Sequence, residues 1–349
     1  MEIKQQIIKK MIFLQHITTA VILFFITTVT FAQNPQKGNY GYLYCHMSDR
    51  GEWTAYAVSR DGYHYQDILG GDSIFSSAKL ARIEGGTRDA YICRDYHCKG
   101  YLMVTTDMCV RKSHAWNNYG IDLLKSKDMI HWTSVTVDFR KFSSTIQRVW
   151  APQIFWNPTY QWENGEKGGY MIYYSILDKS VCPYDRMYYS YADKSFTHIT
   201  APQLLFDWGY ATIDADINYL TSDHLYHLLI KKEGGEPGIY TTTSKSLTGP
   251  WEKPSDKDYV HFEGKKLCEG PSAFQLIGDK TWRVAYIQYS DRPKHYRICK
   301  ADKHLRNFSD PVDIQGVTGP QHGSFMRITK AEYNRLLNWS KDQKTQQQK

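Results

Sequence analysis

Three acidic residues each lie in a short segment that otherwise has the composition of a buried strand. They are Asp89 in RDAYI (88–92), Asp214 in TIDADI (212–217) and Glu269 in EGPSAF (269–274). A carboxylate buried in a strand costs free energy unless it is paired or wetted by a cleft. Carboxylates that converge raise one another's pKa, so one can stay protonated near neutral pH while another is ionised. An acid and a base of this kind are what the hydrolysis of a glycosidic bond with inversion requires.

A loosely repeated pattern indicates how the fold brings these acids together. An apolar strand end, a small residue, a polar turn and an aromatic recur five times, anchored on the small residues Ser59, Ser126, Ala192, Ser244 and Ala301. The intervals between anchors are 67, 66, 52 and 57 residues. Four strands with their turns fit such an interval, and the sequence between the anchors is strand-like. The pattern predicts an all-β fold, a five-bladed β-propeller.

Each anchor should end the third strand of a blade, which places the first, innermost strand some thirty to forty residues upstream. Four anchors have such a strand, at 88–92, 149–154, 212–217 and 269–274, whereas Ser59 lies too near the start of the chain. Residues 321–328 (QHGSFMRI) form a strand without a blade of its own and fit the vacant place. Because a blade left short would expose unpaired backbone, we expect the N- and C-terminal segments to share one blade.

Inner strands start beside the central axis, so their first residues should meet at one mouth of the ring. The three acids precede their anchors by 37, 30 and 32 residues, which puts them at nearly the same place in three blades. Asp216, two residues after Asp214, should share its face of the strand, so the two could exchange roles. Asp95 and Asp107 lie near predicted turns and are expected to be solvated, whereas Asp193 and Asp302 recur within the repeat and are expected to cap turns.

The ends of the chain have other roles. Residues 1–32 combine three lysines, an apolar core and small residues before Gln33, which is typical of a signal peptide; a retained membrane anchor is the alternative. We therefore expect a secreted or periplasmic protein. Residues 33–329 form the propeller, and residues 330–349 are predicted to form a short helix, 330–339, and a disordered polar tail.

Charge and cysteine content narrow the function further. Removing residues 1–32 takes away three Lys and one Glu, so the formal charge falls from +7 to +5, with no basic block that would favour nucleic acid. Seven cysteines do not suit a disulfide scaffold in a chain this long. Cys93 and Cys98 could form a local bridge, but most of the seven are expected to be buried as small apolar residues. We expect a monomer.

The five inner-strand motifs, taken in order, resemble the blade signatures of glycoside hydrolase family 43. They are RDAYI (88–92), VWAPQI (149–154), IDADI (213–217), EGPSAF (269–274) and QHGSF (321–325). That family consists of five-bladed inverting enzymes: arabinofuranosidases, xylosidases and arabinanases. The resemblance spans roughly residues 40–328, and the ordered set is more specific than any single motif.

The resemblance implies a role for each residue. Asp89 would be the general base, Asp214 would tune and orient the acid, and Glu269 would be the general acid. Trp150 would help to form the sugar pocket. His322 would be the axial histidine, which in many relatives lies beside a water-coordinated calcium ion. Two positions depart from the family, because Ala90 stands where Pro is usual and Gln153 where Asp is common.

The sequence therefore favours an exported, exo-acting α-L-arabinofuranosidase on plant polysaccharide fragments, with no cofactor required for the chemistry. A β-xylosidase or an endo-arabinanase of the same family is the nearest alternative. A propeller that binds carbohydrate without turning it over is the second, and the Asp89-Ala90 departure is its support. A phosphorylase or a retaining fructosidase ranks last, because neither a phosphate-binding basic cluster nor a WxNDP-type start is present.

Overall fold

The recurring strand-and-turn pattern folds into five antiparallel sheets. The structure is a computed structural model that describes residues 34–260, 267–290 and 294–347. The predicted signal peptide therefore lies outside the described residues. The strands, in chain order, are β1 Gly41–Ser48, β2 Trp53–Ser59, β3 Tyr65–Asp67, β4 Arg88–Arg94, β5 Tyr101–Asp107, β6 Gly120–Ser126, β7 Trp132–Asp138, β8 Ile146–Gln161, β9 Lys167–Asp178, β10 Arg186–Ala192, β11 Gln203–Phe206, β12 Thr212–Leu220, β13 Leu225–Lys232, β14 Gly238–Ser244, β15 Cys268–Gln275, β16 Trp282–Gln288, β17 His295–Ala301, β18 Val312–Asp313 and β19 Pro320–Ile328.

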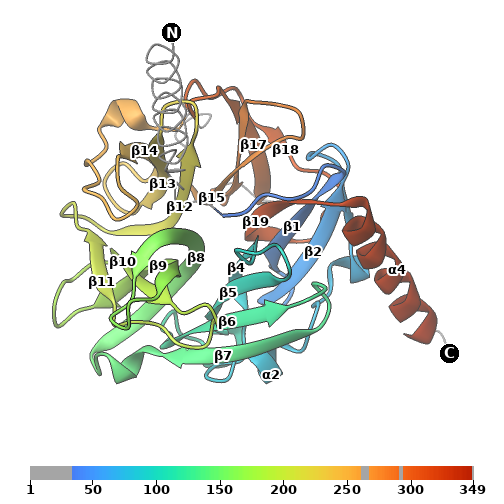
Figure 1. The fold of residues 1–349 in the computed structure, drawn as a ribbon, viewed down its shortest axis with the longest axis horizontal. Coiled ribbons are helices and arrows are strands. Elements are labelled where there is room, and N and C mark those ends of the chain that lie inside the picture. Colours follow the sequence, from blue (N-terminus) through green and yellow to red (C-terminus); the bar gives the residue numbers. More distant parts are fainter. Residues whose placement is uncertain (1–33, 261–266, 291–293, 348–349) are drawn as a thin grey trace, which may run out of the picture. The chain divides into compact units, whose positions relative to one another are not determined.

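The sheets are the blades of a propeller (Figure 1). Their strand orders are β4-β5-β6-β7, β8-β9-β10-β11, β12-β13-β14, β15-β16-β17-β18 and β19-β1-β2-β3. The first strand of each sheet contacts the first strands of the sheets on either side, in the cyclic order β19, β4, β8, β12, β15 and back to β19. This closed circuit of contacts confirms the predicted five-bladed ring.

The blade that joins the two ends of the propeller is formed as expected. Strand β19 pairs antiparallel with β1, with Gly41 opposite Ile328 and Cys45 opposite Ser324. Figure 1 shows these strands, blue and red, side by side. The pairing removes the exposed edge that a short first blade would leave.

All five repeat anchors end the third strand of their blade, namely β2, β6, β10, β14 and β17. An aspartate in the turn that follows explains part of the pattern. Asp193 accepts hydrogen bonds from the backbone N–H groups of Thr197 and His198, and Asp302 accepts from those of His304 and Arg306. These contacts confirm that Asp193 and Asp302 cap turns.

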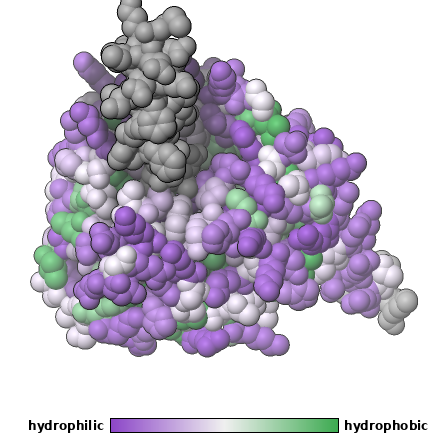
Figure 2. Space-filling view, in the orientation of Figure 1, coloured by the Kyte–Doolittle hydropathy of each residue, from purple (hydrophilic) through white to green (hydrophobic). Residues whose placement is uncertain are grey.

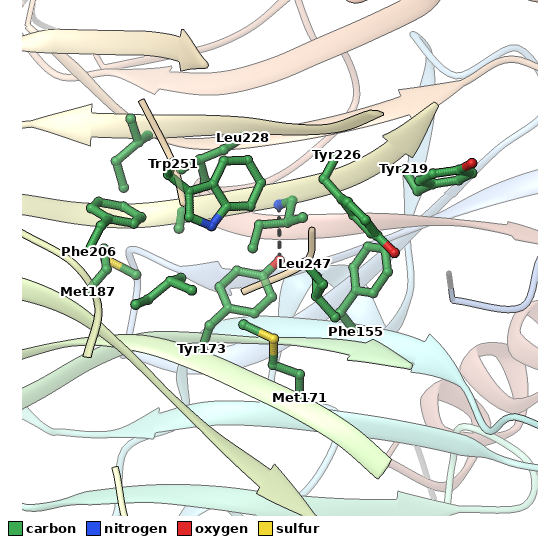
Figure 3. Packing of buried hydrophobic residues seen from close by; sticks show 14 of the residues in the cluster. Phe155, Met171, Tyr173, Met187, Phe206, Tyr219, Tyr226, Leu228, Leu247 and Trp251 are labelled. Atoms are coloured by element: carbon green, nitrogen blue, oxygen red, sulfur yellow. Dashed lines mark hydrogen bonds between the residues drawn. The ribbon is translucent and has the colours of Figure 1, made fainter. Parts of the chain in front are cut away.

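The space between blades is filled with aromatic and aliphatic side chains. Figure 3 shows the cluster that joins β8–β11 to β12–β14, where Tyr173, Phe155 and Trp251 pack together. The buried hydroxyl of Tyr173 donates to Gln153 Oε1 (2.7 Å) and accepts from the backbone N–H of Ile217 (3.1 Å). One tyrosine thus ties two neighbouring inner strands together. Figure 2 shows that the visible face is mostly hydrophilic, with small scattered apolar patches.

The C-terminal helix is longer than expected. Helix α4 spans Lys330–Gln347, so the predicted disordered tail is wrong over residues 340–347. A tertiary contact that composition does not reveal anchors the start of this extension, because Ser340 is buried and its Oγ accepts a hydrogen bond from Leu69 N (2.8 Å). The other helical segments are single turns: η1 Leu69–Gly71, α2 Ser77–Leu80, α3 Val110–Ser113, η2 Phe139–Lys141 and η3 Asp256–Asp258. None of the helices in the described residues could cross a bilayer.

The seven cysteines are all free, so Cys93 and Cys98 do not form a bridge. Five of the seven are buried, as expected of small apolar side chains: Cys45, Cys93, Cys182, Cys268 and Cys299.

Candidate active site

All five inner strands have an inserted residue at the mouth where the predicted acids lie. In β19 it falls between Pro320 and Gly323 and has no left-handed residue, whereas the other four carry the same distortion. In each, three residues of the inner strand span two of its partner, so one extra residue is inserted. In these four strands the shifts fall between Arg88 and Tyr91, Trp150 and Gln153, Ile213 and Asp216, and Glu269 and Ser272. The second residue of each of these four bulges has a left-handed backbone, at Asp89 (φ 52°), Ala151 (49°), Asp214 (54°) and Gly270 (63°). Bulges of this kind commonly re-aim side chains beside active sites.

This distortion refines the expected alignment of the acids. Asp89 and Asp214 occupy the same left-handed position in two blades, a conformation that Asp tolerates better than most residues. Glu269 stands one position earlier, where the other blades have Arg88, Trp150 and Ile213. The following position must be glycine, because a Cβ on Gly270 would lie 2.8 Å from Cγ of His322.

The structure brings all the predicted site residues together in one pocket. Its volume is about 470 Å³, including the solvent at its mouth. It is lined by Met47, Arg88, Asp89, Met108, Trp116, Trp150, Ile213, Asp214, Glu269, Gln321 and His322. Residues separated by more than 200 positions in the chain therefore share a cavity large enough for a small sugar.

Asp89 is held as an ionised carboxylate. Its Oδ2 accepts a hydrogen bond from Thr106 Oγ1 (2.9 Å), and that hydroxyl accepts one from the backbone N–H of Ala151 (2.9 Å). His322 Nδ1 lies 3.6 Å from Asp89 Oδ1. Burial alone would raise the pKa of Asp89, but the close, positively charged ring of His322, with smaller effects of Arg88 and Thr106, lowers it below the ordinary value. Asp89 can therefore accept a proton.

Asp214 is the second carboxylate beside His322, whose Nδ1 lies 3.8 Å from Asp214 Oδ1. The other oxygen of Asp214 accepts a hydrogen bond from Gly270 N (3.0 Å), the residue directly after Glu269. Burial, and then the negative charge of Asp89, raise the pKa of Asp214, although His322 opposes them. Asp214 thus fixes the backbone next to the predicted acid and adds negative charge near it.

Glu269 has the raised pKa that a general acid needs. Burial and the charge of Asp214 raise its pKa to about 7, although Lys231 and His322 oppose the shift. At neutral pH a large fraction of Glu269 therefore carries a proton that it can donate. One pocket thus holds a carboxyl with a lowered pKa and another with a raised pKa, which is how acid and base roles are divided between two carboxyls.

His322 is a cation in this pocket and does not suit direct metal ligation. Burial would lower its pKa, but Asp214 and Asp89 outweigh burial and raise it to about 9. A protonated imidazole has no lone pair to donate to calcium, and calcium prefers six to eight oxygen ligands. Among the described residues, no group of three or more His, Cys, Asp or Glu side chains is arranged to hold a metal ion. The donor set therefore does not fit a directly bound calcium ion.

The bulge also separates two acids that simple alternation would place together. Asp216 accepts hydrogen bonds from Ala273 N (2.8 Å) and Asn218 Nδ2 (2.7 Å), and it is not among the residues that line the pocket. The idea that Asp216 could exchange roles with Asp214 is therefore wrong, because the inserted residue breaks the two-residue period.

Other residues of the site were missed or misread in the sequence. Arg88 and Trp116 line the pocket, and the order of motifs gives no signal for Trp116, which lies in the loop between β5 and β6. Asp107 is fully buried rather than solvated. It accepts hydrogen bonds from the backbone N–H groups of Ile83 (2.7 Å), Glu84 (2.9 Å) and Gly85 (2.9 Å), which holds the loop before β4.

A five-bladed propeller with a buried, carboxylate-lined pocket at the starts of its inner strands has the architecture and the acid–base pair of an inverting glycosidase. Comparison with known proteins agrees with this class. The signature of a family described as a probable glycosyl hydrolase domain, related to glycoside hydrolase family 43, matches residues 38–334. The chain belongs to this family.

The individual relatives are distant. An α-L-arabinofuranosidase of Bifidobacterium longum subsp. longum is 23% identical over 223 residues, covering 56% of this chain but only 19% of that protein. The chain thus spans about a fifth of that curated relative.

Solved structures share the fold at low identity. A family 43 arabinoxylan arabinofuranohydrolase from Bacillus subtilis, in complex with cellotetraose, superposes with a TM-score of 0.55 at 13% identity, covering 82% of this chain and 66% of that one. An α-L-arabinofuranosidase from Podospora anserina, in complex with cellotriose, gives a TM-score of 0.50 at 12% identity, covering 79% and 92%.

Proposed function

We propose that this chain is an inverting glycoside hydrolase that releases terminal α-L-arabinofuranosyl groups from plant polysaccharide fragments. The observation that carries the proposal is the single pocket in which Asp89 has a lowered pKa and Glu269 a raised one. Opposite shifts in neighbouring carboxyls separate a base from an acid.

Each group then has one task. Asp89 takes a proton from a water molecule whose oxygen attacks the anomeric carbon. Glu269 donates its proton to the departing oxygen as the glycosidic bond breaks. Asp214 holds the backbone at Gly270, and the cation of His322 offsets the charge of the two aspartates. Water is the only co-reactant, and the chemistry needs no cofactor.

Pocket size and relatives support the finer parts of the proposal. Trp116, Trp150, Met47 and Met108 bound a cavity of about 470 Å³, which suits one terminal sugar better than a polymer running through it. Both the curated relative and two structural neighbours are arabinofuranosidases or arabinofuranohydrolases. Export is also proposed, from the composition of residues 1–32.

A panel of 4-nitrophenyl glycosides tests the proposal. The α-L-arabinofuranoside should be hydrolysed faster than the β-D-xylopyranoside, and proton NMR should show the β-anomer as the first product. A first product that keeps the α configuration would contradict the role of Asp89. A faster rate on the xyloside would replace the sugar but keep the mechanism.

A further inference from the structure

Trp116 is an exposed aromatic at the rim of the pocket. It is 57% exposed although it lines the same cavity as the three acids. Its ring meets that of Trp150 edge to face, with centroids 6.2 Å apart and an interplanar angle of 70°. An indole that is exposed beside a pocket offers an apolar face on which a ligand can pack.

The position of Trp116 is fixed by a buried carboxylate. The guanidinium of Arg88 lies over the Trp116 ring, 5.2 Å from its centroid, and Arg88 forms an ion pair with Glu52, which is buried. Glu52 also accepts hydrogen bonds from the backbone N–H groups of Val110 (3.1 Å) and Arg111 (2.8 Å), in the loop that carries Trp116. One side chain thus holds both the cation against the ring and the loop beneath it.

A second carboxylate ties the same loop. Glu84 accepts a hydrogen bond from Cys109 N (3.1 Å), and Glu84 itself lies in the segment that Asp107 holds. The indole is therefore preorganised, so a ligand that stacks on it does not bear the full cost of ordering the loop.

These contacts indicate which part of a substrate meets the ring. A sugar held deep in the pocket beside Glu269 has its glycosidic oxygen directed to the mouth, so the leaving group passes the rim. A β-linked pyranose with equatorial hydroxyls presents a flat face of C–H groups, which suits an indole face, whereas a puckered furanose presents less. We propose that Trp116 is the platform for a pyranose leaving group. The chain would then select arabinofuranosyl groups carried on a xylopyranose backbone over those carried on other arabinofuranoses. This inference rests on the proposed function.

Steady-state kinetics with three substrates test it. They are an arabinosyl-substituted xylotriose, α-1,5-arabinobiose and methyl α-L-arabinofuranoside, whose leaving group is too small to stack. Trp116→Ala should lower kcat/KM about tenfold more on the xylotriose substrate than on the methyl glycoside, which has no leaving group that could stack. Trp116→Tyr should restore most of the loss. Leu204→Ala, which removes another exposed apolar side chain, on β11, is the matched control and should change none of the three values.

Two results would overturn the inference. They are an equal loss on all three substrates, which would make Trp116 a general support of the pocket, and a larger loss on arabinobiose, which would mean a furanose platform.

A binding experiment separates this inference from the proposed function. Calorimetry of xylotriose with the Glu269→Gln chain should show binding that Trp116→Ala removes. If wild type hydrolyses no arabinoside yet this binding is present, the platform stands and the proposed function fails. If neither occurs, both fail.

Discussion

The two mouths of the same five inner strands differ in how their polar groups are satisfied. At the mouth that holds the candidate active site (the active mouth), the carboxyl groups of Asp89 and Asp214 both face His322. Their Oδ1 atoms lie 3.6 and 3.8 Å from its Nδ1, distances longer than hydrogen bonds. At the opposite mouth, the Asn34 side chain makes three hydrogen bonds, donating to Ile154 O (2.6 Å) and Tyr91 OH (3.1 Å) and accepting from Trp156 N (2.9 Å).

Cavity size does not identify the functional mouth, but chemistry and backbone geometry do. The opposite mouth has the larger cavity, about 700 Å³, and none of the described residues that line it carries a carboxylate. Arg327 in that cavity donates to the carbonyls of Gln275 (3.1 Å) and Leu276 (2.9 Å), so its charge is used to hold neighbouring backbone. The left-handed residues of the inner strands, and two carboxyls whose pKa values shift in opposite directions, lie at the active mouth instead. Strain and incompletely paired charge mark the functional end, whereas at the structural end Asn34 and Arg327 are held by hydrogen bonds to neighbouring residues.

The largest effect should come from the two catalytic carboxyls at the active mouth. Glu269→Gln and Asp89→Asn should each lower kcat about 10²- to 10⁴-fold on an oligosaccharide, because each removes a positioned proton transfer. On an arabinofuranosyl fluoride, whose leaving group needs no proton, Glu269→Gln should recover much of its rate and Asp89→Asn should not. Asp216→Asn on the same strand as Asp214 is the control and should stay within a few-fold of wild type. Recovery by Asp89→Asn alone would reverse the two assignments.

At the opposite end of the inner strands, a substitution should change the stability of the fold rather than the activity. Glu332 of α4 accepts hydrogen bonds from Arg94 Nη1 (2.7 Å) and Nη2 (2.8 Å) at the end of β4, and both side chains are buried. Glu332→Gln leaves the Arg94 charge without its partner, so we expect a loss of about 3–5 kcal/mol in the free energy of unfolding. The folded fraction should keep its kcat, measured below the unfolding transition. A normal unfolding midpoint in urea would contradict this role.

The pH dependence of that stability has a definite sign. Burial would raise the pKa of Glu332, but Arg94 with help from Thr329 and Tyr101 lowers it from the ordinary 4.5 to about 2. A lowered folded-state pKa stabilises the protein above the unfolded-state value and ceases to do so as the pH falls through about 2. Wild type should therefore lose its advantage over Glu332→Gln between about pH 4.5 and 2.

The sequence predicts the ring because periodic turns and strand composition are local signals. All five anchors end third strands, and the closing pair β1–β19 follows from counting alone. It also predicts the residues of the site, but not their exact alignment. The inserted residue at Asp214 is invisible to a two-residue period, so the separation of Asp216 could not be read from the chain. The place of Trp116 in the pocket and the burial of Asp107 could not be predicted, because loop contacts are set by tertiary packing rather than by local pattern.

A smaller effect concerns the pH profile of the active mouth. Glu269 must be protonated and has a pKa of about 7, so kcat/KM should fall as the pH rises above about 7. Asp89 must be ionised and has a lowered pKa, so the acidic limb should lie below the ordinary range of an aspartate. Measurement of kcat/KM on methyl α-L-arabinofuranoside from pH 3 to 9 checks both limbs. A basic limb well above 7 that also persists in Glu269→Gln would assign the proton donor to another group.

The smallest effect should come from Lys231, which links the pocket to a neighbouring blade without lining it. Lys231 is fully buried on β13, opposite Ile213 of the pocket, and its Nζ donates to Tyr289 OH (3.2 Å). Its positive charge is one of the influences that lower the pKa of Glu269 against burial. Lys231→Met, which keeps the length and removes the charge, should therefore move the basic limb upward by about one pH unit. The kcat at pH 6 should change little, because Glu269 is protonated there in both proteins. Since a buried lysine costs desolvation, the substitution should leave stability unchanged or raise it. A limb that does not move, in a variant that unfolds at the wild-type urea concentration, would show that this charge is too well screened to act on the acid.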